Sequence, residues 1–184
     1  MANPTQNDVT SLATGGHGQQ HRAMVADTAA AAGSVSVQAD GSIVNGKVRF
    51  TAEGGLAIKV TNKTGGNTIK GYLVKASSGT NNAVETVIVD IPDIVGVFYE
   101  NNIADAAEAW VVVSGIADVY FEGNATRGNF MRNQITADAG TIGRAIAEAV
   151  PTAPFATDKH FHEIGHVLES RTGAGLAKAV LHFN

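Results

Sequence analysis

The chain has 184 residues, of which 44% are hydrophobic and 16% are charged, and its formal net charge at pH 7 is −4. This length is sufficient for one or two domains with a proper hydrophobic core. The negative charge, without any Lys/Arg-rich stripe, argues against nucleic-acid binding, because basic side chains must replace the counterions of the phosphates. The chain has no cysteine, which excludes disulfides, thiolate metal sites and a cysteine nucleophile.

The sequence carries no signal for export or for membrane insertion. Residues 1–8 lack both a basic start and an apolar core of the signal-peptide type. No apolar run approaches the roughly 20 residues that a membrane-spanning helix needs. We therefore expect a soluble protein with no membrane partner.

Three segments differ in composition. Residues 1–33 begin polar, become rich in alanine and carry too few large apolar groups to build a core, which predicts an N-terminal arm that is either flexible or ordered by a partner. Residues 34–54 contain the turn signals Asp40-Gly41 and Asn45-Gly46 between alternating apolar residues, which predicts a small β-hairpin region. Residues 55–184 form the third segment, a β-rich domain.

The third segment contains short apolar runs that alternate with turn signals. Such runs, rich in Val, Ile, Tyr and Phe, are typical of β-strands. We therefore predict a mainly β fold, an antiparallel barrel or sandwich built from short strands and hairpins. The first two runs, 56–61 and 68–75, are expected to pair as a hairpin. The strands predicted after them are 86–90, 95–99, 109–114 and 117–122.

An H-E-x-x-H motif spans His162, Glu163 and His166. In zinc peptidases this motif lies on a helix, where both histidines bind one Zn²⁺ and the glutamate activates the metal-bound water. A small zinc-dependent hydrolase that uses residues 162–166 is therefore one functional hypothesis.

The hypothesis needs a third protein ligand. The extended motif of one peptidase class would require glycine at position 169 and histidine at position 172, where the chain has Glu169 and Thr172. Asp158 and His182 are the remaining candidates. No complete ligand set can be assigned from the sequence.

The sequence around the motif favours strands over a helix. Pro151 and Pro154 precede it, and a Gly-containing turn at 172–175 follows it. These signals predict a hairpin, with one strand region at 160–171 and its partner at 176–183. The helical alternative keeps one supporting pattern, because four apolar residues recur at roughly helical spacing: Phe161, Ile164, Val167 and Leu168.

On this interpretation the motif has no catalytic role. We expect no catalytic, cofactor-binding or dedicated metal-binding residues, and at most adventitious metal binding by exposed histidines.

Gly96, Gly143 and Gly165 each follow a β-branched residue and precede a strand-like run, which predicts bulges, bends or close backbone approaches. Trp110 is expected in the core or at a subunit interface. Four aspartates lack calcium-loop spacing and are interpreted as turn residues or solvated edges: Asp90, Asp93, Asp105 and Asp118.

Several blocks carry a family resemblance. Residues 55–65, residues 94–98 leading into 108–119, and residues 163–170 with 180–184 resemble tailed-phage head proteins of the capsid decoration, or cement, type. The resemblance covers about residue 51 to the end. It implies a β-rich protein without enzymatic activity that sits on the outer face of the capsid lattice and reinforces it, commonly as a trimer.

The expected partners follow from that resemblance: the major capsid protein and further copies of the chain, with the virion's outer surface as the location and the host cytoplasm as the site of synthesis. The low charged fraction suits a protein that buries surface against neighbours. The zinc hydrolase remains the alternative. A host-glycan adhesin is a third hypothesis, but the chain lacks the aromatic clusters usual for sugar-binding surfaces.

Overall fold

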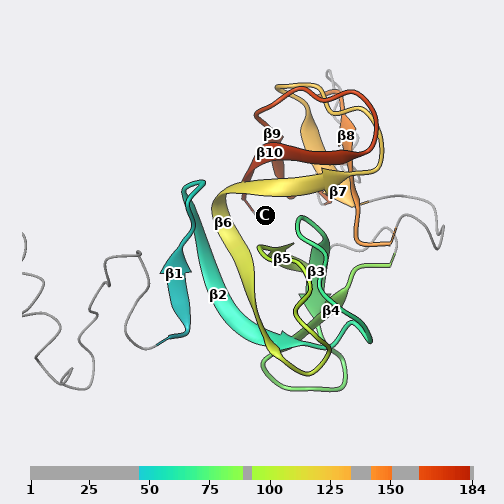
Figure 1. The fold of residues 1–184 in the computed structure, drawn as a ribbon. Coiled ribbons are helices and arrows are strands. Elements are labelled where there is room, and N and C mark those ends of the chain that lie inside the picture. The colour runs from blue at the N-terminus through green and yellow to red at the C-terminus, as the bar shows by residue number, and fades with distance from the viewer. Residues whose placement is uncertain (1–45, 89–92, 134–141, 151–161, 183–184) are drawn as a thin grey trace, which may run out of the picture. The chain divides into compact units, whose positions relative to one another are not determined.

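The computed structural model describes residues 46–88, 93–133, 142–150 and 162–182. The chain divides into two units, 1–49 and 50–184. The arm and most of the hairpin region predicted before residue 55 lie outside the described residues. The described parts form ten strands and no helix (Figure 1): β1 (Val48–Phe50), β2 (Gly55–Asn62), β3 (Leu73–Ala76), β4 (Ala83–Thr86), β5 (Ile94–Phe98), β6 (Glu108–Phe121), β7 (Phe130–Asn133), β8 (Ala145–Glu148), β9 (Gly165–Val167) and β10 (Gly175–Leu181).

Within those ranges, therefore, the structure offers no helix that could cross a membrane.

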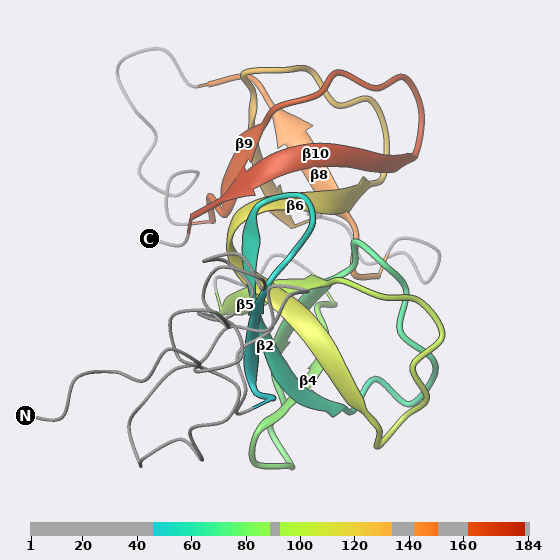
Figure 2. The ribbon, with the colours of Figure 1, turned by 60° about the vertical axis from the view of Figure 1, so that its left-hand side comes forward.

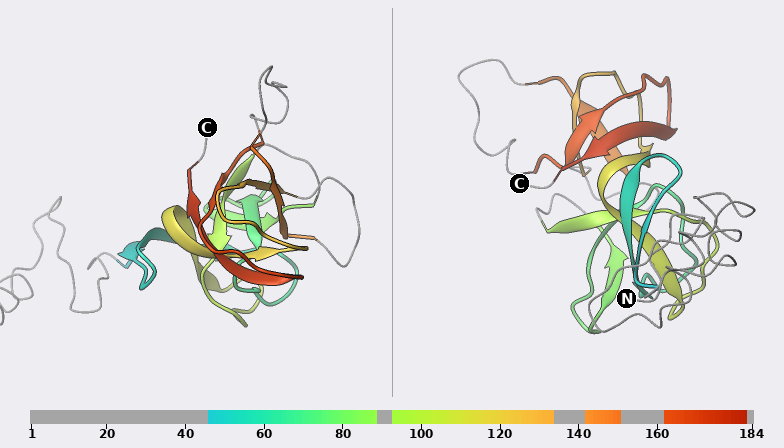
Figure 3. Two further views of the ribbon diagram at one scale, coloured as in Figure 1. Left: turned by 90° about the horizontal axis from the view of Figure 1, so that it is seen from above. Right: turned by 90° about the vertical axis from the view of Figure 1, so that its left-hand side faces the viewer.

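The long strand β6 belongs to two closed rings of strands in the unit formed by residues 50–184. In the first ring β6 pairs with β2 and β5, and β3 and β4 close the circuit between them, in the order β2-β4-β3-β5-β6. In the second ring β6 pairs with β10 and β8, and β9 and β7 complete the circuit, in the order β6-β10-β9-β7-β8. Figures 2 and 3 show the two groups of strands joined by β6. The predicted barrel is confirmed.

The strand β6 changes partners near its middle. Its first half pairs with β5 at Val111 and Val112 and with β2 as far as Gly115, and its second half, from Gly115, pairs with β10. A register shift in the β2 pairing leaves Val113 as an extra residue on β6, which is the pattern of a β-bulge. Bulges bend a strand and increase its twist. The bulge therefore lies where β6 turns from one ring into the other.

The apolar side chains of β6 alternate between two buried clusters, as the period of a strand requires. Trp110 and Val112 join a large cluster that continues into the second ring through Val119 and Phe121. Ala109 and Val111 join a smaller cluster with residues of β3, β4 and β5. Trp110 is buried, which confirms its predicted core position. The large cluster therefore packs β6 into both rings, and the smaller cluster packs it into the first ring.

Several predictions about pairing are wrong. The runs 56–61 and 68–75 do not form a hairpin: β2 pairs with β4 and β6, whereas β3 pairs with β4 and β5. The runs 109–114 and 117–122 are one strand, β6. The strand after the 77–82 loop lies earlier than predicted, at β4. The sheet is also not purely antiparallel, because β2–β4 and β6–β8 are parallel pairs.

Candidate functional site

The H-E-x-x-H segment forms no helix. Its residues Gly165 and His166 belong to β9, which pairs with β10 so that His166 lies opposite Val180. The predicted hairpin is confirmed over the residues that pair. A helix would place His162 and His166 on one face a single turn apart, and the strand removes that arrangement. The geometry that the zinc-peptidase hypothesis requires is therefore not formed.

Close backbone approach explains the glycine inside the motif. A Cβ added at Gly165 would collide with the carbonyl oxygen of Val180, and the residue has φ +150°. An added Cβ would also clash at Gly96, against the carbonyl oxygen of Val112, and at Gly143, where it would lie 2.6 Å from the side chains of Tyr72 and Thr86. Close backbone approach, one of the predicted roles, is confirmed at Gly96 and Gly165, whereas Gly143 faces side chains and has φ +78°.

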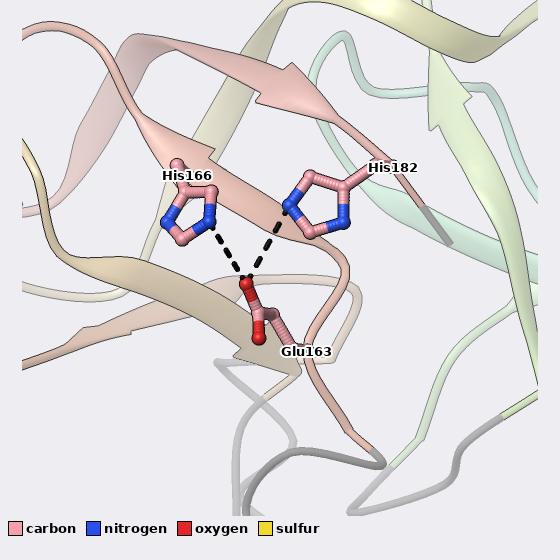
Figure 4. Close-up of side chains that lie close together, drawn as sticks. All are labelled: Glu163, His166 and His182. Atoms are coloured by element: carbon pink, nitrogen blue, oxygen red, sulfur yellow. Dashed lines mark ion pairs between the residues drawn. The ribbon is translucent and has the colours of Figure 1, made fainter. Parts of the chain in front are cut away.

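The structure brings together a different set of side chains. Glu163 lies just before β9, His166 lies within β9 and His182 follows β10 directly, and their ligand atoms all lie within 4.8 Å of one another. Glu163 Oε1 is 3.0 Å from His166 Nε2 and 3.5 Å from His182 Nε2. Both imidazoles direct the same nitrogen at the same carboxylate oxygen (Figure 4). We call these three residues the His–Glu cluster.

Backbone hydrogen bonds at Ile164 hold this arrangement. The N–H of Ile164 donates to the carbonyl oxygen of Met131 on β7 at 2.9 Å, and its own carbonyl oxygen accepts from the N–H of His182 at 3.1 Å. These bonds fix the chain that carries Glu163 against the end of β10. The pairing of His166 with Val180 makes His182 the diagonal cross-strand neighbour of His166, so both side chains leave the same face.

The carboxylate is buried and the imidazoles are not. Glu163 is 6% exposed, whereas the side chains of His166 and His182 are 43% and 41% exposed. The two rings lie with centroids 5.0 Å apart at 43°. A buried carboxylate is stable only when cations or hydrogen-bond donors compensate for its lost hydration. The cluster can supply that compensation through imidazole N–H donors or through a bound cation.

The other candidate ligands do not join the cluster. His162 is partly buried and lies outside it, and Glu169 Oε2 instead accepts from the backbone N–H of Lys178 at 3.3 Å. Asp158 lies outside the described residues. His182 was identified from the sequence only as a remaining candidate. The pairing register of β9 with β10 is what brings His182 close to His166. The sequence does not fix that register, because a long connection joins the two strands.

A second charged group lies on β6. Asp118 Oδ2 is 2.8 Å from Lys70 Nζ, and its Oδ1 accepts from Lys178 Nζ at 3.1 Å. Burial alone would raise the pKa of Asp118, but the hydrogen bonds from the two lysines outweigh it and hold that pKa below its usual value. The Asp118 hydrogen bond in turn raises the pKa of Lys70. Asp118 is a strand residue, so its interpretation as a turn residue is wrong. Asp105 does stabilise a turn, because its Oδ1 accepts a hydrogen bond from the N–H of Gly65.

No family model matches the chain, and no curated protein matches it. Among solved structures, the chain is similar to the N base of the head fiber gp8.5 of bacteriophage phi29. The sequences are 15% identical, the TM-score is 0.47, and the match covers 68% of this chain and 92% of that chain. A likeness at this level transfers no function.

Proposed function

We propose that the protein is a structural component of a phage virion that binds the outer surface of the capsid lattice and stabilises the head. The proposal rests on one observation, the position in the fold of the sequence blocks that resemble decoration proteins. Residues 55–65 contain β2, 94–98 are β5, 108–119 are most of β6, and 163–170 contain β9. The resemblance therefore follows the strands that build both rings, rather than isolated loops.

The surface composition supports binding to neighbours. Large apolar side chains are between 37% and 56% exposed at six described positions, and neighbouring subunits could cover them: Phe50, Ile69, Ile88, Val150, Leu168 and Leu176. Single exposed apolar residues are ordinary on any protein, so their weight is small beside that of the resemblance. The net charge of −4 favours a protein surface over nucleic acid as the partner.

We further infer that the protein acts as an oligomer, commonly a trimer in the family it resembles, and that residues 1–33 form an arm that contacts the major capsid protein or a neighbouring copy. The support for the arm is its composition, which is too poor in large apolar residues for independent folding. An extended segment that orders on a partner can cover a large surface.

Capsid binding can be tested directly. Heads of the encoding phage that lack the protein should be mixed with the purified full-length chain, sedimented and imaged by electron cryomicroscopy. We expect the chain to co-sediment and to add density at regular positions on the outer lattice. Decorated heads should also withstand heating better than bare heads. Failure of the chain to sediment with heads, together with its absence from purified virions by mass spectrometry, would overturn the proposal.

The arm and the oligomer need separate measurements. Deletion of residues 1–33 should leave the β-sheet circular dichroism intact and weaken attachment to heads. Equally tight attachment of the shortened chain would show that the arm has no binding role. Light scattering of the full-length chain should give a mass of about three times 18.9 kDa, whereas a monomer at all micromolar concentrations would contradict the trimer.

A further inference from the structure

We propose that Glu163, His166 and His182 bind one divalent transition-metal ion of the zinc class. This inference is independent of capsid binding and departs from the sequence-based expectation that the chain has no dedicated metal site. It uses a different set of residues from the H-E-x-x-H hypothesis. His182 replaces His162 as a ligand, and Glu163 becomes a ligand instead of a base.

The two oxygen–nitrogen distances fit a tetrahedral ion, and the ligand nitrogens of His166 and His182 lie within 4.8 Å of each other. Zinc binds imidazole nitrogen and carboxylate oxygen at about 2.0–2.2 Å, so two ligand atoms of a tetrahedral site lie about 3.4 Å apart. The distances from Glu163 Oε1 to His166 Nε2 and His182 Nε2 are 3.0 Å and 3.5 Å, on either side of that value. The exposed imidazoles can adjust by small rotations, while the buried carboxylate stays fixed.

The donor set selects the class of metal. Two imidazole nitrogens and one carboxylate oxygen suit Zn²⁺ and its transition-metal neighbours, whereas Ca²⁺ and Mg²⁺ prefer sites made of oxygen ligands. Three protein ligands leave a fourth coordination position. Because His166 and His182 are 43% and 41% exposed, water can reach that position.

Hydrogen bonding without a metal is the competing explanation for the cluster. In that case each imidazole would donate its Nε2–H to Glu163 Oε1, and one carboxylate oxygen can accept both bonds. A metal ion would instead take the place of both protons and put one centred charge beside the buried carboxylate. Titration with Zn²⁺ separates the two explanations, because hydrogen bonding alone gives no stoichiometric metal binding.

A bound ion would join segments that the hairpin turn separates. Glu163 precedes β9 and His182 follows β10, so the metal would fasten the start of one strand to the end of the other. An ion that binds only the folded chain stabilises it by mass action. The melting temperature should therefore rise with zinc concentration and fall when a chelator is added.

The decisive experiment compares variants that distinguish the two ligand sets. Full-length protein without a histidine tag is stripped with chelator and titrated with Zn²⁺ by calorimetry, and with Co²⁺ by visible absorption. We expect one ion per chain and a tetrahedral Co²⁺ spectrum. His182→Ala and Glu163→Gln should each weaken Zn²⁺ binding at least about tenfold, since even the loss of a residue that only supports a ligand costs about 10–100-fold in affinity.

His162→Ala is the matched control. It removes a histidine of the same segment that lies outside the cluster, so Zn²⁺ affinity should not change. Circular dichroism of each metal-free variant checks that weaker binding does not reflect unfolding. The proposal is overturned if the wild type binds no ion, if His182→Ala binds as tightly as the wild type, or if His162→Ala weakens binding as much as His182→Ala does.

Discussion

Gly115 of β6 lies directly opposite Gly55 of β2, and the same Gly115 pairs with Leu181 of β10. Gly115 is therefore the residue of β6 that has a paired partner in each ring. Gly115 has φ +81°, and an added Cβ would lie 2.7 Å from the carbonyl oxygen of Gly54 and 3.1 Å from the Cα atom of Gly55. The crossing of β6 from one ring to the other thus depends on two backbones that approach without side chains between them.

Gly115→Ala should destabilise the fold by about 1–3 kcal/mol, because the new methyl group meets backbone atoms and the positive φ is unfavourable for alanine. Chemical denaturation followed by circular dichroism measures the loss. Gly123→Ala is the matched control, since that glycine has open space around it and no positive φ. Equal stability of the two variants would show that β6 can shift to relieve the contact.

Gly165→Val should be similarly damaging for a different reason. The new side chain would meet the carbonyl oxygen of Val180 and thereby disturb the pairing of β9 with β10. We expect a loss of about 1–3 kcal/mol, seen as a lower melting temperature. Gly79→Val, in an exposed turn without close neighbours, should change little. A Gly165→Val melting temperature close to that of the Gly79 variant would contradict the close approach.

The local features of this fold were predictable from the sequence, and the partner of each strand was not. Alternation of apolar residues located β2 and β5, and the turn signals located the hairpin of β9 and β10. Ring closure depends on contacts between distant segments, such as the parallel pair of β2 with β4, which no local pattern encodes. The residues of the His–Glu cluster were all candidates, but their meeting was not predicted for the same reason, because a register error of one residue moves His182 to the opposite face.

Asn62 shows why the first predicted hairpin fails. Its side-chain amide donates to the carbonyl oxygens of Gly66 and Ile103 at 2.8 Å and 2.9 Å, and its side-chain oxygen accepts from the N–H of Thr64 at 3.1 Å. The turn after β2 is thereby fixed to a loop about 40 residues away in the chain, at Ile103. This attachment directs the chain away from a simple return beside β2.

Asn62→Leu should therefore destabilise the protein by about 1–3 kcal/mol, since the Thr64 N–H loses its acceptor and the carbonyl oxygens of Gly66 and Ile103 each lose one of two donors. The donors that remain are Thr64 Oγ1 for Gly66 and the Thr68 N–H for Ile103. Asn81→Leu, at an exposed turn, is the control and should be nearly neutral. Urea titrations of both variants give the comparison. A loss below about 0.5 kcal/mol for Asn62→Leu would mean that water replaces the amide.

Asp118 links the first ring's loop to the second ring through Lys70 and Lys178. Its pKa is lower in the folded chain than in the unfolded chain, where a free aspartate titrates near 3.9. A carboxyl group with a lowered folded pKa stabilises the fold above its unfolded pKa, and that contribution disappears as the pH falls through the folded pKa. The stabilisation by Asp118 should thus be complete at neutral pH and lost in acid.

Asp118→Asn should reduce stability by about 1–2 kcal/mol at pH 7, because two charge-assisted hydrogen bonds are weakened at a carboxylate that is 17% exposed. The difference from the wild type should shrink steadily as the pH falls below about 4, where the wild-type carboxyl group takes up its proton. Glu108→Gln, which disrupts a 3.8 Å pair with Lys59 at a 50% exposed carboxylate, is the control and should cost almost nothing at any pH. Denaturation curves between pH 2.5 and 7 measure both series. A difference between Asp118→Asn and the wild type that stays constant over this range would assign the loss to packing and reject the electrostatic explanation.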